Sequence, residues 1–183
     1  MTQFSAEPRR PWHLRTLDRA PVLLRRNRDF RRYWVGQSIS LFGDQITELA
    51  VPLAGVLVLH AGPAQMGYLT AANLAPYLLF SLHAGAWVDR RGRRRQVMIA
   101  TDFGRAALLA SVPIAYAFDA LSLEQLYVVA FLTGTLSMLF FVSQSTLFVS
   151  LVPREQYVNA NSLLYGSRAF SFVAGPSVGG GLV

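Results

Sequence analysis

The sequence predicts an all-α integral membrane protein with five transmembrane helices. Of its 183 residues 52% are hydrophobic and only 15% are charged, whereas soluble domains usually carry about 25% charged residues. Residues 49–88 contain no Asp, Glu, Lys or Arg, and residues 125–153 contain neither these nor His. A helix needs about 20 mostly apolar residues to cross the hydrocarbon core. Five stretches meet this need: 33–60, 66–88, 96–118, 125–152 and 157–183.

The chain begins with a basic cytoplasmic arm over residues 1–32. It holds nine of the seventeen basic residues, all of them Arg, interspersed with Trp12 and several Leu. Such a segment either lies on anionic headgroups or forms a disordered basic tail. The transmembrane bundle is expected over residues 33–183.

Each of the five stretches has its own signature. Tyr33 and Trp34 open the first and Trp87 closes the second, at the depth where amphipathic aromatic rings prefer to sit. The third is apolar apart from a few polar positions, the fourth carries no charge, and the fifth is rich in glycine, which membrane helices tolerate. A soluble bundle is disfavoured, because five helices that are apolar all round would leave little polar surface.

The loops alternate in basic charge. The arm, the loop after the second stretch and the loop after the fourth contain Arg, whereas 61–65 and 119–124 contain none. Because cytoplasmic loops are rich in Lys and Arg, the alternation predicts a multi-pass protein of the plasma (inner) membrane with a cytoplasmic N-terminus.

The residue inventory disfavours an enzyme. Cysteine is absent and the three histidines are far apart, so neither metal ligation nor a cofactor is expected. No nucleophile elbow or phosphate-binding loop is present. The basic run at residues 90–95 resembles a nucleic-acid patch in isolation, but it separates two apolar stretches, which favours the lipid bilayer as the partner and excludes nucleic acid.

The segment "GAWVDRRGRRR" (85–95) resembles the signature of the major facilitator superfamily, found in the short loop between spans two and three. The resemblance implies that this loop gates the cytoplasmic side against the second half of a transporter. A simpler alternative is that the arginines only set the topology. The matching gate residues are Gly85, Asp89, Arg90, Gly92, Arg93 and Arg94.

A second resemblance lies in "AGPSVGGG" (174–181), which is similar to the GPxxGG pattern of drug–proton exchangers of the superfamily. Generic helix packing explains this pattern equally well. Residues 30–53 and 152–170 resemble the siderophore and macrolide exporter branch. The matching span-five residues are Gly175, Pro176, Gly179 and Gly180.

The resemblance implies an incomplete six-helix N-terminal bundle of a twelve-span secondary transporter. The expected function is export of a drug-like or siderophore-like molecule by alternating access, with the C-terminal half as the missing partner. Protons as a coupling ion stay open, because residues 125–153 lack the Arg that many proton antiporters carry in span four. The alternative is a small five-span membrane protein with a regulatory or scaffolding role.

Charges within the apolar stretches are candidates for substrate or proton binding. Asp44 and Glu48 share one face of the first span, and Arg168 is the only charge in the fifth. Counted from Tyr33 and from residue 157, Asp44 and Arg168 lie equally deep, at roughly 16 Å. We therefore expect Asp44 to pair with Arg168 in one state, leaving Glu48 free.

The third span holds two charges that are three residues apart. Asp102 and Arg105 therefore share a helical face, a spacing at which opposite charges pair locally. We expect a structural pair here rather than a transport role.

Overall fold

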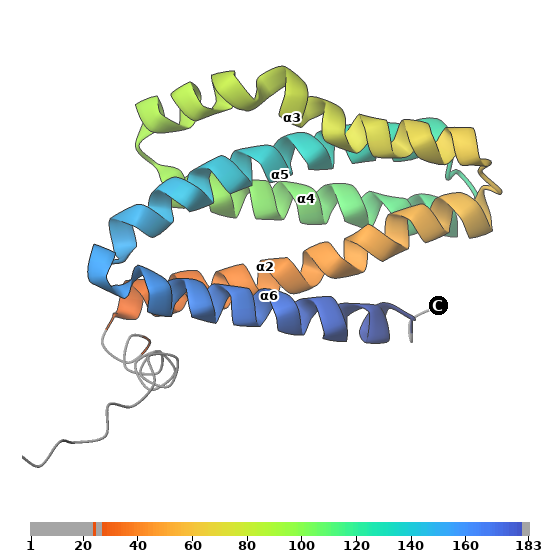
Figure 1. The fold of residues 1–183 in the computed structure, drawn as a ribbon. Coiled ribbons are helices and arrows are strands. Elements are labelled where there is room, and N and C mark those ends of the chain that lie inside the picture. Colours follow the sequence, from red (N-terminus) through yellow and green to blue (C-terminus); the bar gives the residue numbers. More distant parts are fainter. Residues whose placement is uncertain (1–23, 25–26, 181–183) are drawn as a thin grey trace, which may run out of the picture.

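The computed structural model describes Leu24 and residues 27–180, except for the side chains of Asp89, Arg91 and residues 175–180. Five long helices follow one another with short connections, and they run in alternating directions (Figure 1). Their bounds are α2 Arg28–Leu53, α3 Pro63–Arg91, α4 Arg94–Ala117, α5 Leu123–Leu151 and α6 Tyr157–Gly180.

Helix α2 begins five residues before the predicted first span. The Asn27 side chain accepts a hydrogen bond from the Phe30 amide at 3.0 Å, and Asp29 lies in the first turn, where an acid favours the helix dipole. The Asn27 amide also donates to the Leu151 carbonyl at 3.1 Å. The predicted boundary between a basic arm and the bundle at residues 32 and 33 therefore falls inside α2.

The other end of α2 changes its winding. Pro52 lies inside the helix, and residues Ala54–Val58 continue it as a π-helical turn. The chain then reverses through His60, whose φ is 52°, and α3 begins at Pro63. The remaining helices start and end within three residues of the predicted spans, apart from the end of α6, where residues 181–183 lie outside the described residues.

The helices form two groups. Helix α5 packs against both α3 and α4, and α2 packs along α6, with few contacts between the two groups (Figure 1). The α3–α4 turn and the α5–α6 connection lie at the end where α2 starts. The arginines of these two connections are therefore gathered at one end of the bundle, as the predicted topology requires.

Two apolar clusters hold the described helices together, one toward each end of the bundle. The first joins α2, α4, α5 and α6 around Phe30, Met98 and Phe140. The second joins α3, α4 and α5 around Leu69 and Leu126. Polar side chains lie between these two clusters, in the middle of the bundle, and form the site described below.

The exterior is apolar. Leu78, Leu82 and Phe103 are 87%, 88% and 74% exposed, as expected of side chains that face lipid. Three helical segments are long and apolar enough to cross a membrane: Arg28–Val58, Arg94–Ala117 and Leu123–Leu151. All five predicted stretches are helical, but α3 and α6 carry polar residues such as Asn73 and Asn161, so the count of five spans stays a prediction.

The predicted orientation can be tested with single cysteines, because the chain has none of its own. Ala64 and Arg95 are exposed at opposite ends of the bundle, and neither forms a cap. In intact cells an impermeant maleimide is expected to label Ala64→Cys and to leave Arg95→Cys unlabelled until the membrane is permeabilised. Labelling of Arg95→Cys alone in intact cells would invert the orientation.

Candidate functional site

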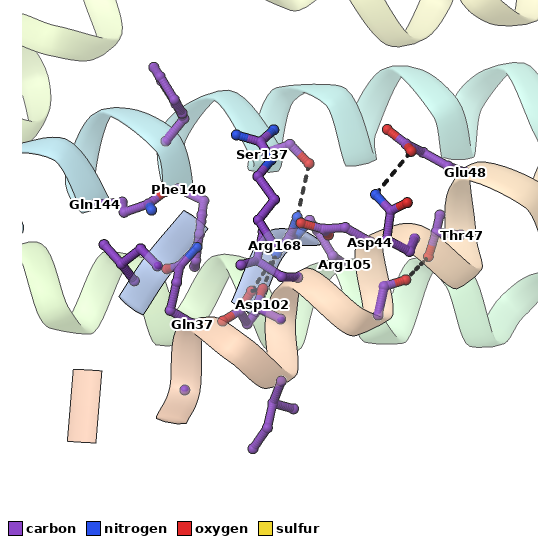
Figure 2. Close-up of a pocket in the computed structure, with 18 of the residues that line it drawn as sticks. Gln37, Asp44, Thr47, Glu48, Asp102, Arg105, Ser137, Phe140, Gln144 and Arg168 are labelled. Atoms are coloured by element: carbon purple, nitrogen blue, oxygen red, sulfur yellow. Dashed lines mark hydrogen bonds and ion pairs between the residues drawn. The ribbon is translucent and has the colours of Figure 1, made fainter. Parts of the chain in front are cut away.

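A polar stripe runs along one face of α2. Tyr33, Gln37, Ser40, Asp44 and Glu48 follow one another at intervals of three or four residues, which places them on the same side of the helix. All five line a cavity of about 920 Å³ that residues of α3, α4, α5 and α6 complete (Figure 2). The sequence identified only the two acids of this stripe.

Arg105 on α4 lies at the centre of the cavity wall. One guanidinium nitrogen donates to Asp44 Oδ1 at 2.7 Å and to Ser137 Oγ at 3.2 Å. The other donates to Asp102 Oδ1 at 2.5 Å and to Ser40 Oγ at 2.8 Å. These five residues, which we call the Arg105 cluster, connect α2 to α4 and α5 at the middle of the bundle.

Burial makes the Arg105 cluster energetically important. Arg105 is only 8% exposed, and its guanidinium carbon lies 4.9 Å from the centre of the Phe140 ring, within the range of a cation–π contact. The Ser40 hydroxyl also donates to Asp102 Oδ1 at 3.0 Å. Two carboxylates and two hydroxyls therefore surround one buried cation and pair its charge, and only the guanidinium Nε is buried without a partner in the described part of the chain.

The predicted contact between Asp102 and Arg105 is present. Asp44 also forms an ion pair with Arg105, and its pairing with Arg168, which was predicted for one state, is absent among the described residues of this structure. The reason is the register of α2 against α6: the Ser38 hydroxyl donates to the Ser167 hydroxyl at 3.0 Å. Arg168 is therefore level with residue 39, and Asp44 lies five residues, roughly 7.5 Å, further along the parallel axis.

Two charges in the cavity have no counter-ion among the described residues. Arg168 lines the cavity, is exposed, and forms no ion pair with that part of the chain. Glu48 is also exposed, and its carboxylate accepts one hydrogen bond, from the Gln45 side-chain amide at 3.2 Å. Within the described part of the chain, the cavity thus holds one cation and one anion without a counter-ion beside the Arg105 cluster.

Two neutral polar groups near the start of α2 are buried at the edge of the cavity. The Gln37 Oε1 atom has no hydrogen-bond partner in residues 27–180, and the Tyr33 hydroxyl lies beside the Gln144 side chain without a well-formed hydrogen bond. Gln37 is 4% exposed. Such groups usually find a partner, so both are available to water or to a ligand in the cavity. Their spacing of four from each other, and of seven from Gln37 to Asp44, is the signal that could have identified them.

The loop predicted to act as a gate is a tight turn. Gly92 ends α3 with a φ of 62°, a left-handed conformation that favours glycine, and α4 begins two residues later. Arg90 and Arg93 are exposed, and Arg94 and Gly85 are half-buried. The Asp89 side chain lies outside the described residues, and so do the side chains of Gly175, Pro176, Gly179 and Gly180, so the roles predicted for both motifs stay predictions.

Comparison with known proteins gives the family. Residues 33–183 match the family described as Major Facilitator Superfamily. This chain belongs to that superfamily. Membership supports the prediction of a protein that is not an enzyme, because the related proteins are named as transporters. No solved structure gives a significant match.

Curated relatives from this superfamily come from two bacterial genera. The uncharacterized MFS-type transporter YfiS of Bacillus subtilis is 29% identical over 164 residues, which cover 88% of this chain and 37% of YfiS. The uncharacterized MFS-type transporters Mb0038c of Mycobacterium bovis and Rv0037c of Mycobacterium tuberculosis are each 33% identical over 171 residues, which cover 89% of this chain and 38% of theirs. The chain thus spans less than two fifths of the length of these relatives.

Proposed function

We propose that this chain forms one wall of the substrate pathway in a secondary transporter that exports a small molecule. The observation that carries the proposal is the cavity of about 920 Å³, lined by charged side chains in the middle of an apolar helix bundle. Its volume lies within the range of about 300–1,000 Å³ typical of small-molecule sites. Ionisable residues at such positions in membrane proteins usually mark a substrate or ion pathway.

A second helical bundle is proposed to cover the open side of the cavity. The chain spans 37–38% of its relatives, which leaves room in the whole protein for such a bundle. Alternating access would then move the two bundles against each other. The turn around Gly92, with Gly85, Asp89 and the neighbouring arginines, would gate the cytoplasmic side, as the sequence motif implies.

The proposed substrate is a drug-like or siderophore-like molecule, and the proposed site is the plasma membrane with the N-terminus inside. The whole protein, expressed in a bacterium that lacks its main efflux pumps, is expected to lower the accumulation of amphiphilic fluorescent compounds. A protonophore should abolish this effect if protons drive export. Unchanged accumulation of every compound tested would contradict the proposal.

Glu48 is the residue most available for proton coupling, because Asp44 is held by Arg105 and Glu48 has no counter-ion in the described part of the chain. Glu48→Gln is expected to flatten the pH dependence of export while leaving the amount of protein in the membrane unchanged. Export rates measured in inverted vesicles between pH 5.5 and 8.5 test this. Glu155→Gln, which neutralises an exposed acid outside the cavity, serves as the control and should keep the normal pH profile. An unchanged profile for Glu48→Gln would exclude Glu48 as the coupling site.

A further inference from the structure

The charges of the cavity separate into an ion-paired set and a set without counter-ions. Within the Arg105 cluster, Asp44 and Asp102 share the guanidinium of Arg105, so both acids are paired, and the cluster carries one excess negative charge when both are ionised. Arg168 and Glu48 line the same cavity without a counter-ion among the described residues. Among the residues that the structure describes, the set without counter-ions therefore consists of one positive and one negative charge.

Arg168 and Glu48 are separated along the helix axis, Arg168 beside the Arg105 cluster and Glu48 beyond it. The contact of Ser38 with Ser167 places Arg168 level with residue 39, whereas Glu48 lies nine residues beyond that level. At about 1.5 Å per residue the two α-carbons are roughly 14 Å apart along the axis. Figure 2 shows Arg168 over the Arg105 cluster and Glu48 to the right of both.

The free-energy cost of leaving Arg168 or Glu48 unpaired in the cavity determines which class of ligand fits. Charges removed from water inside a membrane protein are tolerated when they are paired. A cationic ligand would neutralise Glu48 and leave Arg168 unpaired, and an anionic ligand would do the reverse. A ligand that carries both charges at opposite ends satisfies both residues and leaves the total charge of the site unchanged.

We propose that the cavity selects elongated zwitterions, with the anionic group at Arg168 and the cationic group at Glu48. This inference rests on the proposed transport function and names its substrate class. The end of the cavity that holds Arg168 also holds Tyr33 and Gln37, and the unpartnered Gln37 Oε1 atom can accept a hydrogen bond from the ligand or from its water. Phe140 and Tyr165 also line the cavity, so its wall offers aromatic side chains to the ligand.

A rigid probe and two analogues test the proposal. The probe is 4′-(aminomethyl)biphenyl-4-carboxylic acid, which holds an ammonium and a carboxylate at opposite ends of an aromatic rod. Its methyl ester keeps only the cation, and its N-acetyl derivative keeps only the anion. Binding is measured by isothermal titration with the whole protein in lipid nanodiscs. We expect the zwitterion to bind about tenfold more tightly than either analogue, the size of effect typical of one charge-assisted hydrogen bond.

Two variants separate the two ends of the cavity. Arg168→Gln should bring the affinity for the zwitterion down to that for the ester while the affinity for the ester stays constant. Glu48→Gln should do the same with respect to the N-acetyl derivative. Retained binding of the matching analogue shows that each variant is folded. Arg154→Gln and Glu155→Gln, two exposed residues outside the cavity, are the charge-matched controls and should keep the full preference.

Equal affinities for the three compounds would overturn the proposal, and so would a preference that survives in both cavity variants. Absence of binding by all three compounds would also overturn it. The export experiment proposed above distinguishes failure of the zwitterion preference from failure of the transport function. If the whole protein exports other compounds while these results hold, only the zwitterion preference is wrong. If it exports nothing, the transport function is wrong as well.

Discussion

Arg105→Met is expected to destabilise the protein by about 3–5 kcal/mol, the loss typical when one partner of a buried ion pair is removed. Arg105 is 8% exposed and compensates both Asp44 and Asp102, so its removal leaves two carboxylates without a cation. The same change removes the main polar link between the α2–α6 pair and the α3–α4–α5 group. Reversible unfolding in mixed micelles measures the loss.

Two further variants identify the cause. Adding Asp44→Asn and Asp102→Asn to Arg105→Met removes the stranded charges and should recover most of the stability, because the remaining groups are neutral. Arg154→Met changes an exposed arginine outside the cluster and should shift the free energy of unfolding by less than about 0.5 kcal/mol. A loss for Arg105→Met no larger than that of Arg154→Met would show that the cluster does not stabilise the bundle.

Gly134→Ala is expected to have the second large effect. A β-carbon at Gly134 of α5 would lie 2.1 Å from the Asn73 carbonyl oxygen of α3, and this neighbour is backbone that cannot rotate away. The two helices must therefore move apart, in a region where the Asn73 side chain also donates to the Ala130 carbonyl at 3.3 Å. Overpacking of a buried contact costs about 1–3 kcal/mol, and we expect the upper end or more here.

Gly166→Ala is the matched control, because Gly166 also lies inside a helix but nothing lies within 4 Å of the added β-carbon. Alanine is the better helix former, so this change should stabilise α6 by up to about 1 kcal/mol. The two substitutions are chemically identical and are expected to have opposite signs. Thermal unfolding in detergent measures both. Equal shifts would mean that α3 and α5 are not in close contact at Gly134.

Much of the helix arrangement could be predicted, because apolar length is a strong constraint in a membrane. The charge-free stretch at 125–152 became α5, Leu123–Leu151, with little adjustment. The start of α2 was missed because hydrophobicity marks where a helix enters the apolar phase, whereas Asn27 marks where its hydrogen bonding begins. Helices commonly extend into the interfacial layer, so the two boundaries need not coincide.

Only the charged residues of the candidate site could be predicted from the sequence. Asp44, Asp102 and Arg105 stand out because each is a charge in an apolar stretch, but their partners depend on the register between helices. The assumption that Asp44 and Arg168 are equally deep failed, because it counted from aromatic residues rather than from the contact of Ser38 with Ser167. Neutral residues such as Ser40 and Ser137 have no distinguishing pattern in the sequence, and only the structure shows that they lie beside the Arg105 guanidinium.

The pairing of α2 with α6 also has a consequence for biosynthesis. The Trp34 indole donates to the Leu163 carbonyl at 3.4 Å, a contact across 129 residues of sequence. At a rate of protein synthesis of about 5–20 residues per second, Leu163 of α6 is made roughly 6–26 s after Trp34 of α2. Arg105 is only 61 residues after Asp44 and emerges in about half that time. Arg105 is therefore made early enough to pair with Asp44 before α2 gains its helical partner α6.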